Sequence, residues 1–210
     1  MIVKFDHISY SCSLLKEESA RQLFSEYETV FHEKDLPNLA MKYPYMRKEQ
    51  TTHNIMLLQK AGSYPIEITA YEACEKRAEG KTEKYVLSDD KIDIYSANPM
   101  ETKAFFALLG FKENEEGILE LKPLLDEKPL CIKVCKLPEE STDTHTCFLD
   151  EEGFGSLAFV VDNAKKQKAL FKEKDYPTSE IEELMVNGKK LKIFFTNSPM
   201  GEIIEFIGMR

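Results

Sequence analysis

The sequence lacks several signals that would assign it to a familiar functional class. It has no long uncharged apolar run, and no basic segment followed by the apolar stretch of a secretory signal. It also has no glycine-rich phosphate loop, no Gly-x-Ser-x-Gly elbow and no His-Glu-x-x-His motif. These absences exclude the common nucleotide-binding, serine-hydrolase and zinc-protease signatures. A cytoplasmic location without membrane contact is the expectation.

Cysteine is scarce, and its spacing does not indicate a metal site. Cys131 and Cys135 have three residues between them, with no second close pair or histidine cluster nearby. The total is five, an odd number that does not suit a disulfide framework. We therefore expect buried, reduced thiols at Cys12, Cys74, Cys131, Cys135 and Cys147.

The charge balance is acidic. The chain of 210 residues has a formal net charge of −9, with 42% hydrophobic and 31% charged residues. This composition is typical of a globular protein that buries a core. The negative charge would repel phosphates, so a nucleic-acid partner is not expected. It is compatible with a cationic or neutral small ligand.

The last part of the chain, residues 153–210, has the order β-α-β-β-β. An apolar run from Ser156 to Val161 predicts a buried strand, and Asn163 is a helix cap before Ala164. The Asn187-Gly188 pair predicts a turn between two strands. The strands that follow the helix are expected at residues 184–186, 191–196 and 202–207.

Two earlier segments repeat this order. In residues 1–73 we expect a strand at 2–12, a long helix from Leu14 to Glu33, a loop from Met41 to Thr52 and strands at 54–59 and 66–71. In residues 90–137 we expect a strand at 91–96, a helix that begins near Asn98 and ends at Gly110, and strands at 118–121 and 130–134. Residues 74–89 are crowded with charge and are interpreted as a linker.

Three stretches carry a family resemblance. These are Asp6-His7-Ile8, the segment from Asn98 to Leu109-Gly110-Phe111, and Phe194 to Ile207 with its Asn197-Ser198-Pro199-Met200-Gly201 turn. They resemble the vicinal oxygen chelate superfamily, which includes glyoxalase I, bleomycin-resistance proteins and extradiol dioxygenases. The resemblance implies an α+β fold in which β-α-β-β-β modules form curved, mostly antiparallel sheets around a cup. It groups residues 90–210 as one glyoxalase-like domain of two modules, 90–137 and 153–210.

The resemblance also implies site residues. The family places metal ligands on the first and last strands of paired modules, and His7, Glu67 and Glu205 occupy such positions. Ser156 stands at the remaining first-strand position, where the family usually has histidine. Asp93 and Tyr95 lie near the first-strand position of the middle segment, so Ser156, Asp93 and Tyr95 are candidate ligand-binding residues.

The number of these candidate ligands that lie close together depends on which modules pair. If the first and third pair, His7, Glu67 and Glu205 share one site, which Zn, Ni, Mn, Fe or Co would tolerate. If the second and third pair, Glu205 is left almost alone. Each residue also has an ordinary structural explanation: His7 as a hydrogen-bonded core histidine, and the two glutamates as outward-facing or internally paired carboxylates.

Three functions follow from these alternatives. The first is a protein resembling the bleomycin-resistance proteins, which binds a small molecule in the cup without a complete metal site. The second is a metal-dependent lyase, isomerase or dioxygenase that uses His7, Glu67 and Glu205. The third is a non-catalytic assembly protein. The odd number of modules favours a homodimer.

Overall fold

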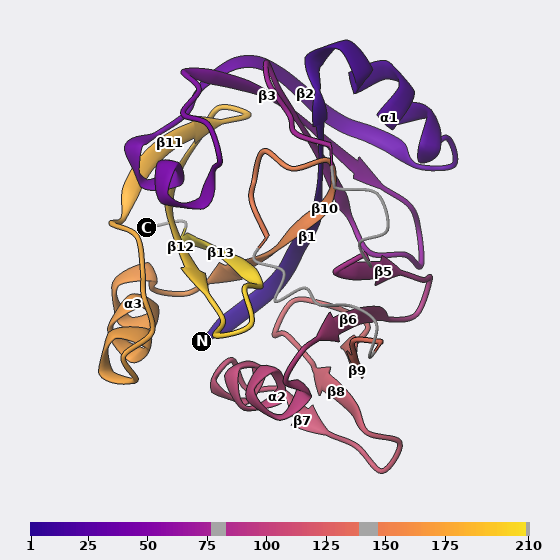
Figure 1. Cartoon of the computed structure of the whole chain (residues 1–210), viewed down its shortest axis with the longest axis vertical. Coiled ribbons are helices and arrows are strands. Elements are labelled where there is room, and N and C mark those ends of the chain that lie inside the picture. Colours follow the sequence, from indigo (N-terminus) through magenta and orange to yellow (C-terminus); the bar gives the residue numbers. More distant parts are fainter. Residues whose placement is uncertain (77–82, 139–146, 209–210) are drawn as a thin grey trace.

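The computed structural model describes residues 1–76, 83–138 and 147–208, which form two sheets with few helices (Figure 1). The larger sheet has eight strands in the order β11-β12-β13-β10-β1-β4-β3-β2, and the smaller has five in the order β5-β6-β9-β8-β7. The larger sheet curves until its two edges approach each other. There, Glu33 on the edge strand β2 accepts a hydrogen bond at 2.9 Å from the backbone amide of Asn187, beyond the other edge strand β11.

The eight-stranded sheet is built from the first and third modules. The first contains β1 (Ile2–Ser13), a 3₁₀ turn η1 (Leu14–Lys16), α1 (Glu17–Leu23), β2 (Glu28–Pro37), a 3₁₀ turn η2 (Ala40–Tyr45), β3 (Thr52–Gln59) and β4 (Ile66–Tyr71). The third contains β10 (Gly153–Val161), α3 (Ala164–Glu173), β11 (Glu182–Val186), β12 (Lys189–Asn197) and β13 (Ile203–Gly208).

The two modules join through their first strands. β1 pairs antiparallel with β10, which places His7 opposite Ala158 and Ser9 opposite Ser156. Within each module the first and last strands are parallel, so that Glu67 of β4 lies beside Ser9 and Glu205 of β13 lies beside Ala158. The two halves therefore repeat one arrangement about an approximate two-fold axis between β1 and β10. Glu67 and Glu205, each on the last strand of its module, therefore occupy equivalent positions on one curved face of the sheet.

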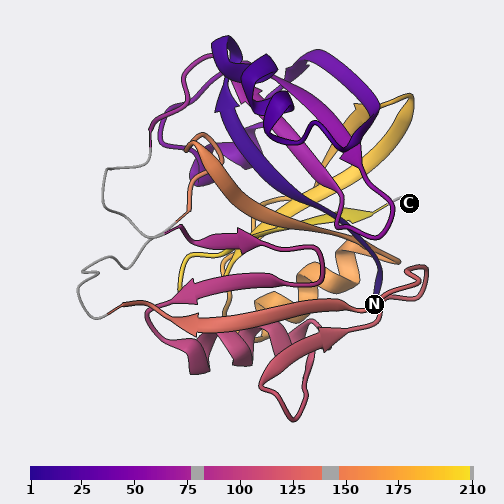
Figure 2. The same ribbon diagram turned by 90° about the vertical axis from the view of Figure 1, so that its right-hand side faces the viewer.

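The middle module forms the smaller sheet. It contains β5 (Tyr85–Leu87), β6 (Ile92–Ser96), α2 (Pro99–Leu108), β7 (Lys112–Glu113), β8 (Ile118–Leu121) and β9 (Leu130–Lys136). In this sheet the short strand β5 pairs with β6, the first strand of the middle module. It lies on the edge of β6 that corresponds to the edge through which β1 and β10 pair with each other. The strands of the middle module lie together below those of the larger sheet (Figure 2).

This pairing differs from the division that grouped residues 90–210 as one domain. The third module is hydrogen bonded to the first across β1 and β10, while β5 occupies the corresponding edge of the middle module. Part of the predicted linker at 74–89 is also structured. Lys84 and Tyr85 are buried, although a charged run is usually solvated; residues 77–82 lie outside the described part.

One helix prediction was wrong. The helix expected from Leu14 to Glu33 ends at Leu23, and the residues from Glu28 onward form β2. The side chain of Arg21 stabilises this end, because its guanidinium donates to the carbonyl oxygens of Phe24 at 2.7 Å and Tyr27 at 2.6 Å. The following residues include the β-branched Thr29 and Val30, which favour a strand.

Other local predictions are confirmed. Asn98 and Asn163 cap α2 and α3 by accepting bonds from Glu101 and Lys166 backbone amides. Gly110 ends the α2 region with a φ of +94°, a conformation that a residue with a side chain rarely adopts. The prediction of five buried thiols holds only in part: all five cysteines are free thiols, but only Cys12 and Cys147 are buried and the other three are half-buried. Among the described residues, no helix has the length and apolarity needed to cross a bilayer.

Aromatic side chains fill the space between the sheets and their helices. Phe206 of β13 stacks on Phe194 of β12, with ring centroids 4.9 Å apart. Phe171 of α3 contacts Phe206 on one side and Phe105 of α2 on the other. This continuous apolar contact joins the third and middle modules and fixes the outer face of the strand that carries Glu205.

Candidate functional site

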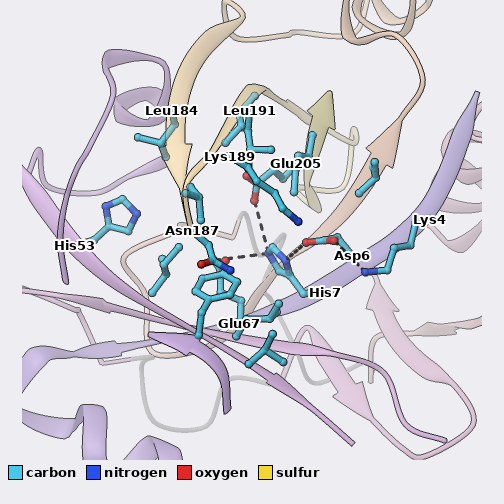
Figure 3. Close-up of a pocket in the computed structure, with 18 of the residues that line it drawn as sticks. Lys4, Asp6, His7, His53, Glu67, Leu184, Asn187, Lys189, Leu191 and Glu205 are labelled. Carbon is cyan, nitrogen blue, oxygen red and sulfur yellow. Dashed lines mark hydrogen bonds and ion pairs between the residues drawn. The ribbon is translucent and has the colours of Figure 1, made fainter. Parts of the chain in front are cut away.

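The concave face of the eight-stranded sheet encloses a cavity of about 290 Å³ (Figure 3). The residues that line it belong to the first and third modules, and one of them, Lys42, lies on the 3₁₀ turn η2. The apolar part of the wall is formed by aliphatic and aromatic side chains, and ionisable groups interrupt it. The ionisable lining residues are Lys4, Asp6, His7, Lys42, His53, Glu67, Lys189 and Glu205. A cavity of this size lies near the lower end of the range of small-molecule sites, which begins at about 300 Å³.

His7, Glu67 and Glu205 meet in this cavity although they are far apart in the sequence. His7 Nε2 lies 3.7 Å from Glu67 Oε1 and 3.8 Å from Glu205 Oε2. All three side chains are largely buried, with 3%, 16% and 13% of their surface exposed. The imidazole therefore stands between one carboxylate of the first module and one of the third, as Figure 3 shows.

Asp6 orients the imidazole from its other side. His7 Nδ1 lies 3.1 Å from Asp6 Oδ2. A proton on Nδ1 makes this nitrogen the donor and directs Nε2 towards the two glutamates. Nε2 is buried and has no hydrogen-bond partner among the described residues. A histidine held by a carboxylate with its second nitrogen free is the arrangement that commonly supports metal-bound histidine.

The cluster shifts the proton affinities of its members. Burial alone would lower the pKa of His7, but Glu67, Asp6 and Glu205 outweigh it and raise the pKa to about 9. Burial and the neighbouring Glu67 raise the pKa of Glu205 to about 7, against the opposing effect of His7 and Lys42. Burial would raise the pKa of Asp6, yet its bond to His7 lowers it to about 2. Near neutral pH the imidazole is thus protonated between carboxylates.

The donor types fit a divalent transition metal, but the atoms stand too far apart to be coordinated as they are. Two ligand atoms that share an ion at about 2.1 Å lie about 3.0–3.4 Å from each other. The distances from His7 Nε2 to Glu67 and Glu205 exceed this range by less than about 1 Å. Within the described residues, no group of three His, Cys, Asp or Glu side chains is already arranged to hold a metal ion. Deprotonation of His7 and a small inward movement of both glutamates would be required.

The other three predicted site residues lie outside the cavity lining. Ser156 is buried, and its hydroxyl is hydrogen bonded to that of Ser9 at 2.8 Å across the β1–β10 junction. Asp93 and Tyr95 lie on β6 in the smaller sheet, where Asp93 forms an ion pair with Lys91 at 3.3 Å. The structure therefore groups His7, Glu67 and Glu205 without Ser156, Asp93 or Tyr95.

Two cavity residues were missed by the sequence analysis. Lys42 belongs to the segment expected to be a loop, and His53 immediately precedes the strand expected at residues 54–59. In the structure Lys42 Nζ lies 3.1 Å from His53 Nε2, and both residues are buried. No sequence signal distinguished this lysine from the other residues of the expected loop.

The first and third βαβββ modules are joined by their first strands around a cup. This is the α+β arrangement of curved sheets that the sequence analysis expected, although a different pair of modules is joined. Similar solved structures include glyoxalase I from Zea mays, with a TM-score of 0.40 and 12% identity over 99% of this chain and 68% of that one. Methylmalonyl-CoA epimerase from Mycobacterium tuberculosis has a TM-score of 0.47 and 12% identity, over 100% of this chain and 89% of that one.

A putative dioxygenase from Bacillus subtilis has a TM-score of 0.40 and 11% identity, and this chain covers 64% of its length. This chain thus spans about two thirds of the glyoxalase and dioxygenase structures. No protein-family model matches the sequence, and no curated protein matches it. At identities of 11–12% and TM-scores below 0.5, these likenesses assign neither a family nor a reaction to this chain.

Proposed function

We propose that this chain is a member of the vicinal oxygen chelate superfamily and binds a small polar molecule in the cup between its first and third modules. The observation that carries the proposal is the convergence of His7, Glu67 and Glu205 on one cavity. Burial of ionisable groups is costly, and their clustering in a cavity with shifted pKa values is typical of binding and catalytic sites. The unpartnered Nε2 of His7 gives the occupant a specific hydrogen-bonding position.

A blocked cavity tests this proposal. Val30 lines the cavity and is 49% exposed, so a Val30→Trp substitution narrows the opening without a large change in the core. We expect small polar compounds that raise the melting temperature of the wild type to bind Val30→Trp at least about tenfold more weakly. Val86→Trp is the matched control, since Val86 is 42% exposed on β5 and lies outside this cavity. Equal binding by all three proteins would place the ligands elsewhere and contradict the proposal.

The geometry around His7 supports a second candidate, a metal-dependent enzyme. In this candidate His7, Glu67 and Glu205 hold a divalent transition metal, and Asp6 keeps the imidazole oriented through Nδ1. The metal would supply Lewis-acid polarisation of the paired oxygens of a substrate. The protein supplies the cavity walls, which limit the access of water, and the Asp6 carboxylate, which orients the imidazole.

Metal content separates the two candidates. We expect a metal enzyme to retain near-stoichiometric transition metal when purified without a polyhistidine tag, and to lose it in His7→Ala and in Glu205→Ala. Asp93→Ala removes a carboxylate from the other sheet and serves as the control that keeps the metal. Elemental analysis before and after incubation with Ni, Mn, Fe, Co and Zn gives the measurement. No uptake by the wild type would reject the metal enzyme and leave metal-free binding in the cup.

A further inference from the structure

We propose that Lys42 and His53 form an anion subsite in the cup, so that its occupant is a small carboxylate. This inference rests on the proposed binding function and names its ligand class. Lys42 comes from the turn η2 rather than from a strand, and its side chain lines the cavity. It is 8% exposed, which is unusual for a lysine without a carboxylate in direct contact.

His53 holds the lysine but leaves most of its hydrogen-bonding capacity unused. Burial and the nearby Lys42 lower the pKa of His53 to about 2, so the ring is neutral and Nε2 accepts from the ammonium at 3.1 Å. The ring is fixed by stacking on Tyr71, with centroids 5.8 Å apart. An ammonium has three N–H bonds. Among the described residues His53 takes one of them, which leaves two for a molecule in the cavity.

Basic and acidic side chains are balanced in the cavity lining, although the chain as a whole is acidic. The lining contains Lys4, Lys42 and Lys189 beside the carboxylates of Asp6, Glu67 and Glu205. Burial lowers the pKa of Lys42, while Glu205 and Glu67 oppose that change. A carboxylate bound at Lys42 would likewise favour the charged ammonium.

The positions of the charged side chains in the cavity also favour one orientation of a bound molecule. Asp6 and the two glutamates already surround His7, whereas Lys42 has only a neutral histidine within hydrogen-bonding distance among the described side chains. A carboxylate would gain charge-assisted hydrogen bonds at Lys42. A hydroxyl or carbonyl on the same molecule could then reach the cluster around His7. The favoured class is a hydroxy- or oxo-carboxylate.

Glycolate and glycolamide provide a matched pair of test compounds, because they differ mainly in the charge of one end. We expect the wild type to bind glycolate at least about tenfold more tightly than glycolamide, measured by calorimetry or by chemical-shift titration. Lys42→Met should abolish this preference, and its thermal unfolding without ligand shows whether the variant is folded. Lys4→Met is the control: it removes the same charge from the same lining, but Lys4 is already paired with Asp6 at 3.4 Å. It should keep most of the preference.

The outcomes separate this inference from the proposed function. Equal affinity for the two compounds, or an unchanged preference in Lys42→Met, would overturn the anion subsite. If neutral compounds still bound and Val30→Trp still blocked them, binding in the cup would stand without the subsite. If glycolate bound through Lys42 but Val30→Trp did not weaken it, the occupant would not lie in the cup and the inference would fall.

Discussion

Lys84→Met is expected to lower the free energy of unfolding by about 3–5 kcal/mol, because it leaves a buried glutamate without its counter-ion. Lys84 Nζ lies 2.7 Å from Glu202 Oε1, and the two side chains are 2% and 0% exposed. The ammonium also donates to the carbonyl oxygen of Met200 at 2.7 Å, and the other carboxylate oxygen of Glu202 accepts from Ser198. Burial raises the pKa of Glu202, while Lys84 opposes that rise.

Denaturant unfolding of single and double variants tests this expectation. Lys84→Met combined with Glu202→Met replaces both charges by apolar groups and should recover most of the lost stability. The exposed pair Lys190 and Glu183 gives the comparison, since removal of the Lys190 charge should leave the unfolding midpoint unchanged within error. A double variant as unstable as Lys84→Met alone would show that the lysine acts through packing rather than through charge.

The Lys84–Glu202 pair shows one kind of information that the sequence did not reveal. Lys84 lies in a charged run, and such runs are usually solvated, so the segment was interpreted as a linker. Its burial depends on contact with a turn more than one hundred residues later. Strand β5 follows directly and pairs with β6, so it occupies the edge of β6 that corresponds to the β1–β10 junction. The composition of a segment does not reveal a contact with residues so distant in the sequence.

The strands and ligand positions were more predictable because their signals are local or periodic. The apolar runs around Ile66 and Ile203 define the last strands, and the family motifs place Glu67 and Glu205 on them. His7, Glu67 and Glu205 could therefore be named from the sequence, but their meeting depended on which modules pair. Lys42 could not be named, since a short 3₁₀ turn carries no periodic pattern and reaches the cavity through tertiary contacts alone.

The stability of the metal-free protein is expected to fall by about 3 kcal/mol between pH 6.5 and pH 9 because of His7. The pKa of this imidazole is 6.5 in an unfolded chain and about 9 in the folded protein. Its stabilising contribution is therefore fully present below pH 6.5 and is lost as the pH rises through 9. Glu205, with its pKa raised from 4.5 to about 7, acts in the same direction at lower pH.

His7→Gln isolates this contribution, because glutamine keeps a polar side chain at the site but does not titrate. Urea unfolding at pH 6.5 and 9, with a chelator present, should give a smaller loss of stability for His7→Gln than for the wild type. His53 has its pKa lowered to about 2, so it reduces stability only as the pH falls below 6.5, outside this window. Groups that do not interact with His7 cancel in the comparison, but Glu205 does not, because His7 opposes the rise of its pKa. Both proteins therefore carry Glu205→Gln. Equal losses in the two proteins would mean that His7 is neutral in the folded state, with Asp6 and the glutamates failing to hold its proton.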